Sequence, residues 1–385
     1  MAHTDNYTMK KFFILLVFLP VFVFAEPMYS PKWGFFIDFP EGYQYADGDG
    51  QDRFSFNGPE GLMVDLVVYS GRFNSMLELV NDVNSKLSNR GDVDFFQYRG
   101  KEAAILRLEF GGNTGWGVVA ELNRLNGSAS SAAPMLLALA YSPKGNDELE
   151  LFSLSALDSI SPSEGARRYP GIITDYSYPR GAQKQVSLAA NGLIALVREN
   201  DAEAAQVLIE REFAILEMYL NTPLLQDACV RYYRFIYRDS YDRIADAASV
   251  IARSLGARPN MTADQKRQFA QRVLTFVQNF NYERDLKTSD FINLVTAITE
   301  GRGDCDSRSM LFALILANAD IRASILLSHH YSHAMGLADV TGNGARFEAL
   351  GTQWLVAETT DKIDIGLIDQ EISDPRYWFA VILEE

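Results

Sequence analysis

The stretch GDCDSRSMLFALILANA, positions 303–319, constrains the fold of this chain more than any other segment. Its length favours a helix over a strand, and its apolar residues point in nearly every direction around a helical axis. These residues are Met310, Leu311, Phe312, Leu314, Ile315 and Leu316. Asp304 is a favourable N-cap after a glycine-containing approach. The sequence therefore predicts a helix that is buried on most sides, with Cys305 in its first turn.

The composition of the chain indicates a globular protein. Its 385 residues are 48% apolar and 22% charged, which suits two or three folded domains. The formal net charge of −15 disfavours a broad electrostatic contact with nucleic acid or anionic lipid. We therefore expect no nucleic-acid partner.

Positions 1–25 carry the pattern of a secretory signal peptide. Lys10 and Lys11 precede an unbroken apolar stretch at positions 12–24, which the small residue Ala25 follows. These thirteen apolar positions are fewer than the about 20 residues that span a bilayer. We expect cleavage after Ala25, export to the periplasm or the extracellular space, and no stable membrane insertion of the mature protein.

Positions 26–160 alternate between β-rich runs and turn signals. GFFIDF, RFSFNG, LMVDLVVYS, AAILRLEF, GWGVVAELN and MLLALAYS predict strands, and Asp47-Gly48-Asp49-Gly50 predicts a turn. One helix is expected from Ser75 to Leu87, where apolar residues recur at helical spacing. An antiparallel sheet with a packed helix is the simplest arrangement, and the chain is expected to belong to the α+β class.

The remaining chain divides by composition into three parts. Positions 161–184 concentrate Pro, Gly and Ser and predict a linker. Positions 185–258 predict helices that break near Thr222-Pro223, with Cys229 as a buried core residue on an apolar stripe. One helical face is expected to carry Val207, Leu208, Ala214, Ile215 and Met218. Positions 259–385 form the last unit, which begins with a helix capped by Thr262 or Asp264.

Cys305 is one of two cysteines, and its position suggests a nucleophile. A helix N-terminus stabilises a thiolate by roughly 0.3–1 kcal/mol, whereas Asp304 and Asp306 destabilise it when they are ionised. The helix alone therefore cannot activate the thiol. A thiolate that reacts at neutral pH needs a cationic partner, and an imidazolium is the most economical one.

Three histidines follow the predicted signal peptide, and all lie downstream of Cys305: His329, His330 and His333. The sequence ASILLSHHYSHAMGLADV predicts a strand, a short break and a second strand. On extended chain His329 and His333 would share one face. The cluster could also bind a metal, but no further ligand stands at a metal-motif spacing, so we expect neither a metal nor a cofactor.

An acidic residue that orients His333 would complete a catalytic group. Asp339 lies six residues along the same strand, roughly 20 Å away at ~3.3 Å per residue, and is too distant. Glu348 would need a turn where the chain has no turn residues. Glu358 would meet His333 in a hairpin centred near Ala345, beside the turn-rich TGNGA. Glu358 is therefore the predicted third member.

Cys305 could instead be a structural residue. In an oxidising compartment two cysteines often form a disulfide. A bond between Cys229 and Cys305 is thus an alternative, and it would remove the nucleophile.

The order of these residues resembles the transglutaminase-like superfamily of papain-related thiol enzymes. The likeness covers positions 274–366 and is carried by FVQNFNYERD, GRGDCDSRSMLFALILANADIRASILL, HAMGLADV and WLVAETT. It implies a papain-like α+β domain in which Cys305, His333 and Glu358 form the catalytic triad. Glu358 stands where the family usually has Asp, and Met335 stands where an aromatic residue commonly follows the His-Ala pair.

The resemblance also implies a function. It predicts an exported thiol enzyme that acts on amide bonds of protein or peptide through a cysteine acyl-thioester, as a peptidase or amidase or by protein-glutamine acyl transfer. Tyr282 is either a hydroxyl donor to the oxyanion or a core tyrosine. The alternative is a catalytically weak or inactive binding or scaffold protein. The N-terminal domain, which loosely resembles small α/β sandwich domains of the PsbP/Mog1-like kind, would bind a partner in either case.

Overall fold

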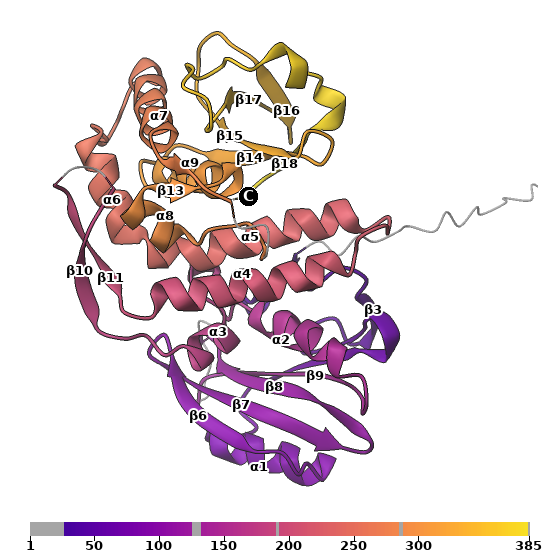
Figure 1. Ribbon diagram of the computed structural model, residues 1–385. Helices are drawn as coiled ribbons and strands as arrows, with labels where there is room; N and C mark the ends of the chain where they lie inside the picture. Colours follow the sequence, from indigo (N-terminus) through magenta and orange to yellow (C-terminus); the bar gives the residue numbers. More distant parts are fainter. Residues whose placement is uncertain (1–26, 125–131, 190–191, 285–287, 384–385) are drawn as a thin grey trace, which may run out of the picture.

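The computed structural model describes residues 27–124, 132–189, 192–284 and 288–383. The predicted signal peptide lies outside these ranges. Within them the chain is of the α+β class, as predicted, and its layers stack from an antiparallel sheet through a layer of helices to a second, smaller sheet (Figure 1). Across the described ranges, no helix combines the length and apolar character needed to cross a bilayer.

A seven-stranded antiparallel sheet forms the N-terminal layer, in the order β3-β4-β5-β9-β8-β7-β6. The strands are β3 (Gln44–Gly48), β4 (Arg53–Asn57), β5 (Met63–Tyr69), β6 (Val93–Tyr98), β7 (Lys101–Phe110), β8 (Asn113–Glu121) and β9 (Met135–Pro143). Five of the predicted runs form β4, β5, β7, β8 and β9. GFFIDF forms only the short strand β2 (Phe36–Ile37), which pairs with β1 (Met28–Tyr29). Strand β3 was not predicted because it is exposed throughout and lacks apolar alternation.

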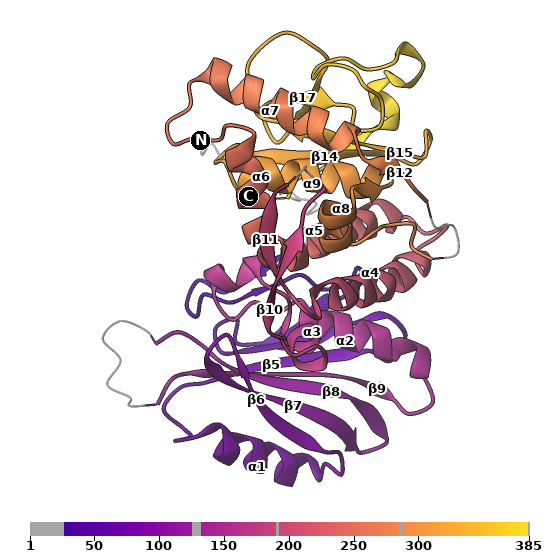
Figure 2. The same cartoon turned by 60° about the vertical axis from the view of Figure 1, so that its left-hand side comes forward.

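Helices cover both faces of this sheet (Figure 2). Helix α1 (Met76–Leu87) begins after the N-cap Ser75, as predicted, and packs Leu79, Val80 and Val83 against one face. Helices α2 (Glu150–Asp158) and α3 (Ile172–Ser177) cover the opposite face. Helix α2 was not predicted, since its residues are buried on nearly all sides and show no helical period.

The segment at positions 161–184, predicted as a linker, is packed rather than extended. It contains the 3-10 helix η3 (Glu164–Arg168) and α3, and Ile172 and Ile173 are buried in the core of the sheet. Pro and Gly residues here end short elements instead of marking a free connection.

The middle layer consists of α4 (Asp201–Glu217), α5 (Leu225–Arg243) and α6 (Ala245–Ser254), preceded by the hairpin of β10 (Gln183–Ser187) and β11 (Ile194–Arg198). The predicted break near Thr222-Pro223 is confirmed. The predicted single apolar face is not: Leu208 and Ile215 are buried in different cores, whereas Val207 and Met218 are exposed. Helix α4 packs between two layers, so its buried stripe changes direction along its length.

The C-terminal layer is built around α9 (Cys305–Ala317), which begins after the N-cap Asp304, as predicted. Its neighbours include α6, α7 (Ala263–Gln278), α8 (Leu294–Glu300) and the strands β14 (Ala323–Ser328) and β15 (His333–Ala338). These strands belong to a five-stranded sheet in the order β16-β17-β15-β14-β18, with β16 (Arg346–Ala349), β17 (Thr352–Ala357) and β18 (Phe379–Val381). Two further short strands, β12 (Asn281–Tyr282) and β13 (Arg302–Gly303), pair with each other. Helix α9 is thus covered on all sides, as its sequence requires.

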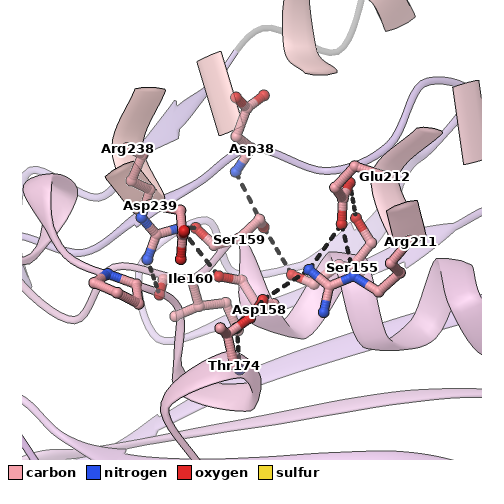
Figure 3. Close-up of polar contacts among 12 residues, drawn as sticks. Asp38, Ser155, Asp158, Ser159, Ile160, Thr174, Arg211, Glu212, Arg238 and Asp239 are labelled. Carbon is pink, nitrogen blue, oxygen red and sulfur yellow. Dashed lines mark hydrogen bonds and ion pairs between the residues drawn. The ribbon is translucent and has the colours of Figure 1, made fainter. Parts of the chain in front are cut away.

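A buried polar network joins the N-terminal layer to the middle helices (Figure 3). Arg211 on α4 forms ion pairs with Asp158 at the end of α2, at 2.7 Å, and with Glu212 at 2.8 Å. Arg231 on α5 binds the other oxygen of Glu212 and the hydroxyl of Ser155, each at 2.8 Å. These charges are buried and paired, so the network fixes how the two layers sit together.

Arg238 on α5 closes the same junction. Its guanidinium donates to successive backbone carbonyl groups at the end of α2, which a helix terminus leaves without intrahelical partners: Asp158, Ser159 and Ile160 (Figure 3).

Candidate active site

Cys305 is fixed at the first turn of α9 by polar contacts of its neighbours. The carboxylate of Asp304 accepts a hydrogen bond from the backbone N–H of Ser307 at 2.8 Å. The buried guanidinium of Arg308 donates to three backbone carbonyl groups: Gly303 at 3.1 Å, Phe280 at 2.8 Å and Thr359 at 3.4 Å. Arg308 therefore ties the turn that carries the thiol to the chain immediately after Glu358. Sequence reasoning missed this residue, whose signal is a charged side chain inside an otherwise apolar helix.

His333 and Glu358 meet as the sequence predicted. The Nε2 atom of His333, at the start of β15, lies 2.7 Å from Oε2 of Glu358, which directly follows β17. The other oxygen of Glu358 accepts hydrogen bonds from the backbone N–H and the hydroxyl of Thr360, at 2.7 and 2.6 Å. The backbone carbonyl of Glu358 accepts from Gln278 at 2.8 Å. The carboxylate is thus held on both sides and aimed at the imidazole.

Strand register explains this meeting. Strand β15 pairs with β17 so that Gly336 lies opposite Ala357 and Ala338 opposite Leu355, which centres the pairing next to Arg346. Strand β16 is inserted between them in sequence and pairs on the outer side of β17. The two strands therefore pair as expected, with a centre about one residue beyond the predicted one, although the connection between them contains a strand of its own.

Cys305 and His333 line the same cavity, which has a volume of about 470 Å³. The backbone N–H of Ala334, the residue after His333, lies close enough to the thiol to lower its pKa. Because Nε2 of His333 is engaged by Glu358, Nδ1 is the ring nitrogen left to exchange a proton with a group in the cavity. The structure thus brings the three predicted residues to one place.

The charges beside Cys305 oppose ionisation of its thiol. Burial, followed by the charges of Asp306 and Asp304, raises the pKa of Cys305 above its ordinary value. Burial and the charge of Asp306 also raise the pKa of Asp304, while burial, with a smaller contribution from Asp290, raises the pKa of Asp306. The flanking acids therefore raise the pKa of the Cys305 thiol, as expected. The thiol stays protonated unless a base takes its proton.

For His333 and Glu358, favourable polar contacts outweigh burial in setting the pKa of each side chain. Burial lowers the pKa of His333, but the hydrogen bond and charge of Glu358 outweigh burial and raise it above its ordinary value. Burial raises the pKa of Glu358, while the hydrogen bonds from His333 and Thr360 bring it below its ordinary value. Glu358 therefore stays ionised and supports a protonated His333.

His329 and His330 do not join His333. Residues 329–332 form the turn between β14 and β15, so the shared face expected for extended chain does not exist. The ring of His329 packs against Phe379, and His330 stacks on Tyr377 with ring centroids 4.0 Å apart. Among the described residues, the group with metal-ligating atoms close together is Asp304, Cys305 and Asp306, and it contains no histidine.

Cys229 is buried on α5, as predicted, and it lines the same cavity as Cys305. Both cysteines are free thiols, so the alternative disulfide is not formed in this structure. Burial raises the pKa of Cys229 to about 12, which leaves it unreactive at neutral pH.

Tyr282 is exposed rather than part of a core, with 53% of its surface accessible. It lies in β12, which pairs in parallel with β13 so that Tyr282 is opposite Gly303, two residues before Cys305. Burial of its hydroxyl and the nearby Cys305 raise its pKa to about 12, so the hydroxyl remains a proton donor. Its role toward an oxyanion stays a prediction.

Comparison with known proteins gives no family. No family model matches the chain, and no curated protein matches it. Among solved structures, the crystal structure of a candidate protease from Parabacteroides distasonis matches at 9% sequence identity with a TM-score of 0.22. The match covers 78% of this chain and 42% of the other, so this chain spans about two fifths of that structure.

Proposed function

We propose that this protein is a cysteine-dependent thiol enzyme of the transglutaminase-like kind, which acts on amide bonds of protein or peptide. The observation that carries the proposal is the 2.7 Å contact between His333 Nε2 and Glu358 Oε2. His333 lines the same cavity as Cys305. A nucleophile, a base and an orienting acid from three separate elements form the arrangement that acyl transfer requires.

The chemistry begins with a proton transfer. His333 Nδ1 takes the thiol proton, and Sγ of Cys305 attacks the amide carbonyl carbon to form a C–S bond. The oxyanion accepts hydrogen bonds from backbone N–H groups in the first turn of α9, which have no intrahelical acceptor. The C–N bond then breaks, and the amine leaves with the proton that His333 returns. Water or a second amine attacks the thioester and frees Cys305.

A generic acyl donor tests this proposal without knowledge of the substrate. With p-nitrophenyl acetate, the Cys229→Ala protein should release about one equivalent of nitrophenolate in a rapid burst, because the thioester forms faster than it hydrolyses. Peptide mass analysis should place the acetyl group on Cys305. The burst should disappear in Cys305→Ala and slow by about 10²-fold or more in His333→Ala. Added primary amine that speeds the second phase would indicate acyl transfer rather than hydrolysis.

The second candidate is a binding or scaffold protein that retains the fold with little chemistry. It is favoured by one observation: Cys305 is only 7% exposed and its neighbouring acids raise the pKa of its thiol. An absent burst, or acetylation of Cys305 at the same rate with and without His333, would support this candidate and contradict the enzyme.

A further inference from the structure

The cavity beside Cys305 has a wall that the acyl transfer above does not use. This wall comes from α4, α5 and the chain before α8, and its side chains are largely aromatic: Phe213, Tyr232, Tyr233 and Phe291. Asp304 and Asp306 line the same space. Arg284 also lines it, but its guanidinium pairs with Asp290 at 2.5 Å.

Asp306 is the acid best placed to meet a substrate. It is half-buried, and its Oδ1 atom lies 3.9 Å from Sγ of Cys305. The nearby hydroxyl of Tyr233 is a donor that offsets part of the rise in the pKa of this carboxyl group. A carboxylate can accept about four hydrogen bonds, so that donor does not saturate it.

Tyr232 gives an independent sign of a ligand. Its side chain is 4% exposed, it lines the cavity, and its hydroxyl oxygen is buried without a hydrogen-bond partner among the described residues. Buried polar groups in folded proteins nearly always have partners. An N–H donor in the cavity would satisfy this oxygen, while the tyrosine rings offer negative faces to a cation.

We propose that Asp306, Tyr232 and Tyr233 form a cation subsite that binds a primary ammonium or guanidinium group of the substrate beside Cys305. The inference rests on the proposed function, because the cation belongs to the molecule whose amide Cys305 attacks. Carboxylate and aromatic groups together recognise organic cations, whereas an anionic group would meet like charge in a partly desolvated cavity.

The subsite also gives the substrate a part in activating the nucleophile. The charge of Asp306 opposes ionisation of Cys305 in the empty cavity. A bound cation offsets that charge, so the thiol ionises more readily once the correct substrate is in place. The enzyme would thereby keep Cys305 protonated and less open to oxidation between turnovers.

Thiol reagents that differ only in charge test the subsite directly. The Cys229→Ala protein is treated with 2-aminoethyl methanethiosulfonate, a cation, or with 2-sulfonatoethyl methanethiosulfonate, an anion, and each rate is divided by the rate with N-acetylcysteine amide. We expect a normalised preference of about tenfold or more for the cation. Asp306→Asn should reduce the preference to about threefold or less, whereas Asp364→Asn, an exposed acid outside the cavity, should leave it unchanged.

A competition experiment needs no change at Asp306. In the same Cys229→Ala protein, n-butylammonium should slow the cationic reagent, and n-butanol should not. Equal normalised rates for the two reagents, or an undiminished preference in Asp306→Asn, would overturn the subsite while leaving the Cys305–His333 pair intact. Failure of Cys305 to react with either reagent would contradict both the subsite and the proposed function.

Discussion

At the scale of single residues, His333 is the group whose state depends most on one neighbour. Burial alone would lower its pKa, and the hydrogen bond and charge of Glu358 reverse that effect. The bond between Nε2 and Glu358 also selects which ring nitrogen faces the cavity. The proton transfer proposed for His333 should therefore respond to changes at Glu358.

The variant Glu358→Gln keeps the size of the side chain and removes its charge. The pKa of His333 should fall below its value in the unaltered protein, because burial then acts without the opposing charge. An NMR titration of the ring protons measures this change, with the His330 signals as an internal control. An unchanged pKa of His333 would show that Glu358 does not govern its ionisation.

The same pair sets a pH window for stability. Because the pKa of His333 is raised in the folded protein, His333 stabilises the fold fully at pH values below its unfolded pKa, near 6.5. This stabilisation is lost as pH rises through the folded pKa. Because the pKa of Glu358 is lowered in the folded protein, Glu358 stabilises the fold fully at pH values above its unfolded pKa, near 4.5. This stabilisation is lost as pH falls through the folded pKa. Both residues therefore stabilise the fold fully only at pH values between the two unfolded pKa values. The Glu358→Gln variant should lose most stability in that pH range.

The sequence identifies some of these residues and not others, for a physical reason. Glu358 could be predicted because strand register and turn residues fix which side chains meet across a hairpin. Arg308 and Tyr233 could not be predicted. Arg308 binds backbone carbonyl groups, and Tyr233 lies beside the carboxyl group of Asp306, and only tertiary packing brings these groups together. The opposing effect of Asp304 and Asp306 on Cys305 follows from adjacency alone and was predicted.

At the scale of elements, α5 joins the two halves of the molecule. Arg231 on this helix is 3% exposed and binds both Glu212 and Ser155, while Arg238 binds the carboxyl end of α2. Neither contact has a local sequence signal, because the partners are 19 to 80 positions apart along the chain. Helix α2 itself escaped prediction for a related reason, since full burial removes the period that marks a helix.

The variant Arg231→Met tests the junction. Removing one member of a buried ion pair leaves Glu212 buried with only Arg211 and Ser155 as partners, so the free energy of unfolding should fall by about 3–5 kcal/mol. Urea unfolding followed by circular dichroism measures the loss. Arg322→Met, which breaks the exposed pair with Asp339, should cost about 1 kcal/mol or less. Equal losses in the two variants would mean that the buried network does not hold the layers together.

At the scale of the whole molecule, the helices of the middle layer belong to two hydrophobic cores. Ile215 on α4 and Ala228 on α5, together with Tyr219 in the connection between the two helices, pack into the core under the N-terminal sheet. Leu208 and Cys229, from the same two helices, pack into the core around α9. The composition of the chain marks a change near position 185 but does not reveal this sharing, because a composition shift says nothing about which face of a helix meets which sheet.

The arrangement places Cys305 and the proposed cation subsite between α9 and α5, where the middle and C-terminal layers meet. Helices α4 and α5, which also contribute to the core under the N-terminal sheet, lie between that sheet and α9 (Figure 1). The C-terminal layer therefore carries the proposed nucleophile, base and acid, and the middle layer forms the opposite wall of the cavity.

The coupling between Cys305 and His333 is the central claim, and the pH dependence of Cys305 alkylation by iodoacetamide in the Cys229→Ala background tests it most directly. The rate should rise as His333 loses its proton and level off above its raised pKa, because the imidazole then accepts the thiol proton. In His333→Ala the rate at neutral pH should fall by about tenfold or more and keep rising into the alkaline range, since burial and the neighbouring acids raise the pKa of the thiol. Identical profiles with and without His333 would contradict the account.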